Sequence, residues 1–141
     1  MNDSNTNVGG WMNSVMRTST MVTLFNGLAS DLKAVIKPVD KRTSKGNYFT
    51  TKDTTSDKLF LLSEIEIFGS IKYSVSGEGS QYQFYKSGNS KIKKVGSYAR
   101  YWWERSPLAD DTTAFCSVSS YGNANCNVAS SSIGVAFGFC I

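Results

Sequence analysis

The N-terminal quarter of the chain carries apolar residues at helical spacing. Between residues 11 and 28 they recur every three to four positions, a period typical of amphipathic helices. The polar run 18–20 weakens this pattern, so we expect two short helices there. Another helix should start at Ser30-Asp31 and end before Pro38, because Ser and Asp cap helix N-termini and proline cannot continue a helix.

The middle of the chain alternates polar segments with short apolar runs. Residues 39–57 are polar and predict an exposed strand or loop, whereas residues 58–62 predict a buried strand. Ser63 followed by Glu66 is a capping-box pattern, so a short helix should begin there and stop near Gly69.

Two glycine-flanked segments and one aromatic strand follow. Residues 77–79 lack the strand and helix of a phosphate-binding loop and predict a flexible turn. Tyr82 and Tyr85 predict one turn of helix, and the bulky residues of 97–104 predict a strand covered on both faces.

The last third has the pattern of antiparallel strands. Ser, Asn and Gly separate three short apolar runs, with turns expected at Tyr121-Gly122 and at residues 132–134. The runs span 114–118, 124–128 and 135–141. Helices in the N-terminal half followed by a β-meander in the C-terminal half predict an α+β fold.

A chain of 141 residues fits one domain, and a hydrophobic fraction of 40% suffices for a core. The first ten residues are mostly polar, so we expect residues 1–10 to be a disordered or linking N-terminus and residues 11–141 to form the domain. No run approaches the length of a membrane span, and the N-terminus lacks the features of a signal peptide.

The net charge of +4 raises the question of nucleic-acid binding. No Lys or Arg occurs after Ser106, and the dense run of Lys91, Lys93 and Lys94 matches no nucleic-acid motif. We therefore expect a solvated basic face, no nucleic-acid partner and no membrane insertion.

The sequence offers little catalytic or metal chemistry. It has no His, which excludes the familiar Ser-His and Cys-His arrangements, and the carboxylate pairs closest in sequence are Glu64 with Glu66 and Asp110 with Asp111. The spacing of the three cysteines matches no zinc site, which leaves free thiols, or one disulfide with a thiol left over. We expect no enzyme activity, no catalytic residue, no cofactor and no metal.

Four stretches of sequence carry a resemblance. They are Gly9-Gly10-Trp11, the run Lys58 to Ser63, the block Tyr101-Trp102-Trp103-Glu104-Arg105-Ser106-Pro107, and the C-terminal Gly134-Val135-Ala136-Phe137-Gly138-Phe139-Cys140-Ile141. Together they resemble C-type-lectin-like domains of unknown function from gut bacteria and phages. The resemblance implies the C-type-lectin-like fold and, because such domains recur as targets of diversity-generating retroelements, a hypervariable C-terminal segment. The Glu-Pro-Asn or Gln-Pro-Asp tripeptide of calcium-dependent sugar binding is missing, so no calcium site is expected.

Retroelement diversification makes a prediction about residue types. Randomising the adenines of Asn codons never gives Lys, Glu, Gln, Met or Trp. None of these five types occurs from Leu108 to Ile133, although all five occur before residue 108. An ordinary Ser/Asn-rich β-meander is the alternative explanation.

The resulting hypothesis divides the domain into a scaffold (11–107), a variable ligand-binding segment (108–133) and a closing core strand (134–141). The predicted ligand-binding residues are Leu108, Asp110, Asp111, Ala114, Ser117, Ser119, Ser120, Tyr121, Cys126, Val128, Ser130, Ser131 and Ile133. Core positions should be Phe115, Val118, Ala124, Ala129 and Val135, together with Trp102, Trp103 and Phe137.

We therefore expect a phage tail or fibre receptor-binding domain on the virion surface that attaches to a host cell-surface protein or glycan. The scaffold should dock to other virion proteins, and related tail-fibre proteins imply a homotrimer. A bacterial surface adhesin of the same fold, extracellular or on the cell surface, and a non-variable structural virion protein are the alternatives.

Overall fold

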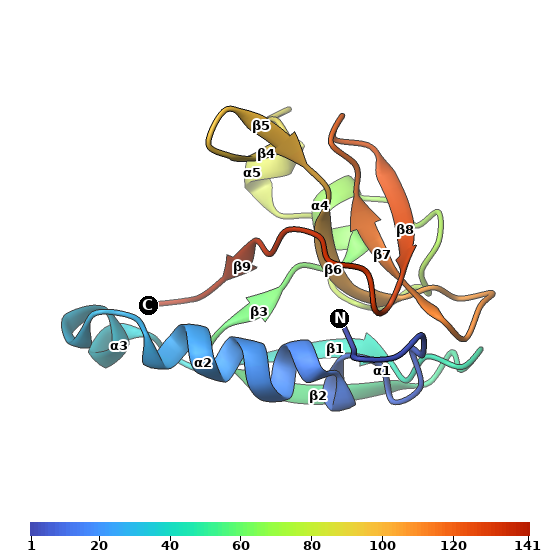
Figure 1. Ribbon diagram of the computed structural model, residues 1–141, viewed down its shortest axis with the longest axis horizontal. Helices are drawn as coiled ribbons and strands as arrows, with labels where there is room; N and C mark the ends of the chain where they lie inside the picture. Colours follow the sequence, from blue (N-terminus) through green and yellow to red (C-terminus); the bar gives the residue numbers. More distant parts are fainter.

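The computed structural model describes residues 1–141. Helices occupy the start of the chain and lie along one side of the molecule (Figure 1). They are α1 (Gly10–Asn13), the π-helical turn η1 (Met16–Thr20), α2 (Met21–Asn26) and α3 (Ser30–Val35). The helical spacing is confirmed, but the break expected at residues 18–20 is absent, because η1 runs directly into α2. None of the helices has the length and apolar character that crossing a membrane requires.

The middle of the chain forms a hairpin, a short strand and a capped helix. Strands β1 (Val39–Ser44) and β2 (Lys52–Asp57) pair along their whole length beside the helices. β3 (Phe60–Leu61) is buried, as predicted. The capping box is confirmed at the start of α4 (Glu64–Phe68), where Ser63 and Glu66 exchange both hydrogen bonds, and Gly69 ends the helix with φ 74°.

The second half of the chain is mainly antiparallel sheet. After α5 (Gln83–Lys86) comes a small projecting hairpin and then a three-stranded sheet in the order β6-β7-β8 (Figure 1). The hairpin is β4 (Lys93–Val95) with β5 (Tyr98–Arg100), and the sheet is β6 (Trp102–Pro107), β7 (Ala114–Val118) and β8 (Ala124–Val128). The α+β class and the first two strands of the meander are confirmed. The last strand departs from expectation, because β9 (Phe137–Gly138) pairs with β3 and not with β8.

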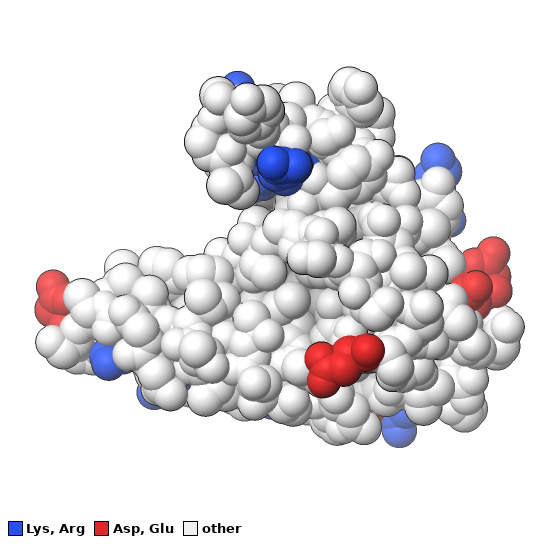
Figure 2. Space-filling view, viewed as in Figure 1, with Lys and Arg blue, Asp and Glu red and all other residues white.

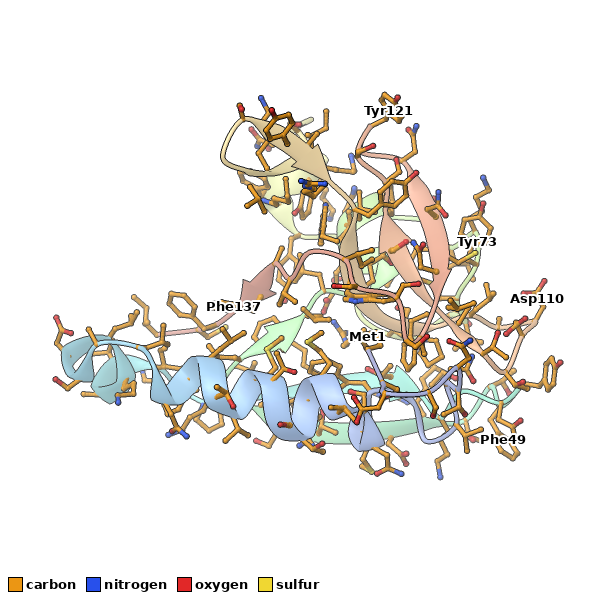
Figure 3. All side chains as sticks on the ribbon, in the orientation of Figure 1. Met1, Phe49, Tyr73, Asp110, Tyr121 and Phe137 are labelled. Atoms are coloured by element: carbon orange, nitrogen blue, oxygen red, sulfur yellow. The ribbon has the colours of Figure 1, made fainter.

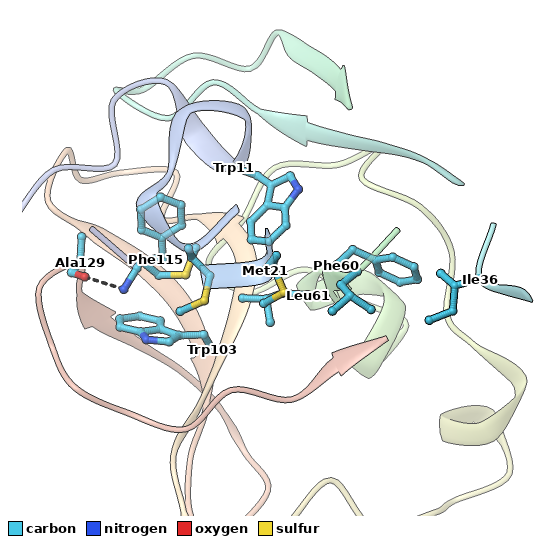
Figure 4. Packing of buried hydrophobic residues seen from close by; sticks show 11 residues of the cluster. Trp11, Met21, Ile36, Phe60, Leu61, Trp103, Phe115 and Ala129 are labelled. Carbon is cyan, nitrogen blue, oxygen red and sulfur yellow. Dashed lines mark hydrogen bonds between the residues drawn. The ribbon is translucent and has the colours of Figure 1, made fainter. Parts of the chain in front are cut away.

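The two consecutive tryptophans of β6 divide the core in two. Successive side chains of a strand point to opposite faces. Trp103 joins the main cluster with Trp11, Leu61 and Phe115 (Figure 4), whereas Trp102 joins a smaller one under α4 and α5. The burial predicted for both tryptophans is confirmed, and Phe137 packs half-buried against the main cluster.

A buried ionic centre joins β1, α4 and β6. The guanidinium of Arg105 donates to both carboxylate oxygens of Glu66 and, at 2.6 Å, to the carbonyl of Glu78. Lys41 adds a second cation 3.2 Å from Glu66. Burial alone would raise the pKa of Glu66, but Arg105 and Lys41 outweigh it and hold that pKa below its ordinary value.

The loop at residues 77–79 is part of this centre. The Glu78 side chain is fully buried, accepts a hydrogen bond from the Ser44 amide at 2.7 Å and another from the Ser106 hydroxyl. The prediction of a flexible turn was wrong, because the hydrogen bonds that the Glu78 carboxylate accepts from Ser44 and Ser106 fix the loop.

The first ten residues are also ordered, contrary to the prediction. The amine of Met1 donates to the carbonyl of Ala129 at 2.8 Å, and Met1 and Asn7 are buried. The polar groups of residues 1–10 donate hydrogen bonds to backbone carbonyls far along the chain. The spacing of apolar residues in the sequence does not reveal such bonds.

Candidate ligand-binding surface

The hairpin of β7 and β8 presents the centre of the predicted variable segment. The amide of Ser119 donates to Asn123 and that of Ala129 to Thr113, so the backbone bonds close the hairpin at both ends. Tyr121, at the turn, leaves 81% of its surface exposed, and Val128, at the end of β8, leaves 44%. Gly122 with φ 83° makes the predicted turn.

The predicted ligand-binding residues fall into three groups by exposure. Four are exposed, namely Asp110, Tyr121, Val128 and Ser130. Five are half-buried, namely Asp111, Ser120, Cys126, Ser131 and Ile133. Four are buried, namely Leu108, Ala114, Ser117 and Ser119, and for these the prediction of an exposed contact was wrong.

The four errors fall at three places in the structure. β7 is the central strand of its sheet and both of its faces are covered, so Ala114 and Ser117 are buried, Ser117 as fully as Phe115. Ser119 is held inside the turn, where its hydroxyl accepts the amide of Asn123 at 3.1 Å. Leu108 is buried next to the start of β7, where its amide donates to the carbonyl of Ala114 at 3.1 Å.

Among the predicted inward anchors, Phe115, Val118 and Ala129 are fully buried, which confirms them. Ala124 is half-buried on the edge strand β8. Val135 is 38% exposed, so its assignment to the core was wrong. The chain at Val135 runs between the backbone contact of Gly134 with Tyr101 and strand β9, and no element covers it there.

The exposed positions do not gather in one patch. Tyr121 projects from the turn of the hairpin and Asp110 from the opposite end of the sheet (Figure 3). Concave surface next to the segment occurs at Ile133, in a hollow of about 320 Å³ between β4, β5 and the chain before β9. Six residues line it, namely Val95, Arg100, Tyr101, Ser132, Ile133 and Gly134.

Two of the six lining residues, Val95 and Arg100, come from the projecting hairpin. The sequence predicted a solvated basic face at its start and, for residues 97–104, one strand covered on both faces. The second prediction was wrong for β5, which is exposed along its whole length, and holds for Trp102–Glu104 in β6, which are buried.

The sequence feature that could have indicated this hollow is the residue types Val95, Arg100 and Tyr101, because an apolar, a basic and an aromatic residue together suit ligand binding. The structure shows that Val95 and Arg100 are exposed. The chain just before the hairpin also approaches the variable turn, because Ile92 lies next to Gly122.

The backbone of the variable segment is held from outside. The side-chain amide of Asn7 donates to the carbonyls of Leu108, Asp111 and Ala114, at 3.2, 2.7 and 2.9 Å. The Asn7 backbone amide donates to the carbonyl of Thr112 at 2.7 Å. These bonds use only backbone atoms of the segment, so they form whatever side chains it carries.

The ionisable groups outside this surface form no open site. Glu104 is completely buried and neither of its oxygens has a hydrogen-bond partner. Burial first, and then the charges of Glu64 and Glu78, raise its pKa well above the ordinary value. None of these three carboxylates lines a pocket, and no cluster of His, Cys, Asp or Glu is placed to hold a metal.

The three cysteines are free, and Cys116 lies in β7, whereas Cys140 follows β9 and forms an isolated bridge with Lys37. The largest pocket, about 370 Å³, lies between α2 and β2. Its one carboxylate, Asp57, is already bonded to Trp11, Thr55 and Arg17.

The fold and this surface define a small α+β domain with an ordered core and an uncharged C-terminal hairpin whose turn is exposed. The chain belongs to the family "Domain of unknown function (DUF6273)", whose model matches residues 1–141. No curated protein and no solved structure matches the chain.

Proposed function

We propose that this chain is a ligand-binding domain whose segment 108–133 displays interchangeable side chains to a partner and performs no catalysis. The observation that carries this proposal is how the segment is held. Asn7 and Met1 donate hydrogen bonds to its backbone carbonyls, while Tyr121 and Val128 project into solvent. A surface held in this way tolerates many side chains, because its conformation is set by residues outside it.

The composition of the segment supports the same proposal. Residues 108–133 contain none of the five residue types that adenine randomisation of Asn codons cannot produce. The display positions we propose after the structural corrections are Asp110, Asp111, Ser120, Tyr121, Cys126, Val128, Ser130, Ser131 and Ile133.

The proposed setting is attachment of a phage to its host. In it the domain has the C-type-lectin-like fold, lies on the virion surface as part of a homotrimeric tail or fibre protein, and binds a host cell-surface protein or glycan. The resemblance of the Tyr101–Pro107 and Gly134–Ile141 blocks to C-type-lectin-like domains supports this setting.

Comparing the 3′ end of the gene among close isolates tests the proposal. The expected result is that amino-acid differences concentrate at the nine display positions and spare Phe115, Val118 and Ala129. A reverse transcriptase gene and a near-copy of the segment Trp102–Ile141 should lie nearby. Differences spread evenly along the chain, or a last third as constant as the scaffold, would contradict the proposal and favour a non-variable structural protein.

A further inference from the structure

The half of the molecule around the hollow at Ile133 carries exposed cations and no exposed anions. Residues 79–103 contain five basic residues and no acidic one, and residues 112–141 contain no charged side chain. Of the five, Lys86, Lys94 and Arg100 are exposed, and Lys91 and Lys93 are half-buried. Figure 2 shows basic atoms beneath the projecting hairpin, where the surface is indented, and no acidic atoms over the hairpin.

None of these cations is neutralised within the chain. The four ion pairs of the structure involve Arg17, Lys41, Lys45 and Arg105 only. Arg100 is exposed, and no protein group accepts a hydrogen bond from its guanidinium. Its guanidinium carbon lies 5.9 Å from the centre of the Tyr98 ring, a contact that leaves the five N–H donors free. Since Arg100 also lines the hollow, these donors are available to a ligand there.

The lining suits a particular kind of anion. A guanidinium binds a planar carboxylate through two parallel hydrogen bonds. The Tyr101 ring, Val95 and Ile133 offer apolar surface, and the Ser132 hydroxyl offers a hydrogen-bond partner. A sugar ring presents one apolar face and a rim of hydroxyls, and a volume of about 320 Å³ holds one or two such rings.

We infer that the hollow formed by Val95, Arg100, Tyr101, Ser132, Ile133 and Gly134 binds a carboxylated sugar of an acidic glycan, with Arg100 on the carboxylate. This inference rests on the proposed ligand-binding function and names its ligand class. Nucleic-acid binding uses several cations that are spaced to match successive phosphates. Only one guanidinium, that of Arg100, lines this hollow, which favours a ligand with a single carboxylate on the bound sugar.

The test uses oligogalacturonate, which carries one carboxylate on each ring, and its fully methyl-esterified form as the matched neutral probe. Calorimetric titration of the full chain at low salt should show binding of the acid and at least about tenfold weaker binding of the ester, a difference of about 1.4 kcal/mol. Arg100→Gln should lose about tenfold for the acid, and Arg100→Lys should recover only part of it, because lysine lacks the planar fork.

Lys86→Gln is the matched control, since it removes one exposed cation on α5, outside the hollow. It should change the affinity by less than about twofold. Thermal unfolding should be the same for all three variants, because these side chains are exposed and unpaired.

Equal binding of acid and ester, equal losses from Arg100→Gln and Lys86→Gln, or no binding of the acid would each overturn the inference. Tighter binding of polyglutamate of equal charge would also overturn it and would identify an acidic peptide as the ligand. None of these results alters the pattern of differences among isolates, so the proposed function is tested separately.

Discussion

The side-chain amide of Asn7 lies 2.7 Å from the backbone carbonyl oxygen of Asp111, a residue 104 positions later in the chain. This contact ties the start of the polypeptide to the start of the segment proposed to vary. It binds main-chain atoms only, so it is indifferent to the identity of residue 111.

Removing this amide should destabilise the fold. In Asn7→Ala three carbonyls lose a donor, two of them in buried hydrogen bonds, and we expect the free energy of unfolding to fall by about 2 to 3 kcal/mol. Urea denaturation measures this change. Asn5→Ala is the control, because Asn5 is exposed and bonds only Ser130, so it should cost less than about 0.5 kcal/mol. Equal losses in the two variants would show that Asn7 does not hold the segment.

The ion pair between Arg105 and Glu66 makes a second prediction. Replacing Arg105 with Met leaves the Glu66 carboxylate buried with Lys41 as its only cation, which should cost about 3 to 5 kcal/mol. Arg42→Met, at an exposed position of β1, should stay within about 0.5 kcal/mol. Chemical denaturation of both variants gives the comparison. A mild effect of Arg105→Met would indicate that the centre is not closed to water.

Glu104 predicts a loss of stability as the pH rises. Its folded-state pKa is raised well above 4.5, so above pH 4.5 the folded chain keeps a proton that the unfolded chain has released. The contribution of Glu104 to stability is therefore greatest below pH 4.5 and falls as the pH rises towards the raised pKa, by up to about 1.4 kcal/mol per pH unit.

Glu104→Gln removes this titration. The variant should show a flatter loss of unfolding free energy between pH 5 and 8 than the wild-type chain. A difference in unfolding free energy that is the same at every pH reflects the buried amide of Gln. The slope of the unfolding free energy against pH therefore decides the result. Parallel pH profiles of the two proteins would contradict the assignment of a protonated Glu104.

The three thiols should react with a thiol reagent in order of exposure. Cys140 is exposed, Cys126 is half-buried and Cys116 is buried. Burial also raises the pKa of Cys126 and, more strongly, that of Cys116, so both have less reactive thiolate. Kinetics with Ellman's reagent should show one fast and one slow thiol, with the third reacting only in denaturant. Cys140→Ser should remove the fast phase alone, and a fast Cys116 would contradict the burial of β7.

Local patterns in the sequence predicted the local elements well. The capping box at Ser63, the spans of β7 and β8 and the burial of Trp102 and Trp103 all follow from residue type and spacing. Long-range pairing does not, which is why β9 was placed beside β8 when it pairs with β3. The buried roles of Asn7, Glu78 and Met1 could not be predicted either, because a polar residue reveals nothing in sequence about partners 30 to 130 positions away.

The candidate site could be predicted only in part, because it too depends on contacts between residues far apart in the sequence. Alternation of exposed and buried residues holds for a strand with one open face, and β7 has none, so Ala114 and Ser117 were misplaced. The contribution of Arg100 depends on how the β4–β5 hairpin folds over Ile133, which is a tertiary relationship.

The central claim is that the fold does not depend on the side chains it displays. Its most direct test is the free energy of unfolding of the combined variant Tyr121→Ser, Val128→Ser and Ser130→Ala. We expect it within about 1 kcal/mol of the wild-type value, because exposed positions contribute little. Phe115→Ala, one fully buried residue of the same hairpin, should lose about 3 to 5 kcal/mol. A loss of that size in the combined variant would contradict the account.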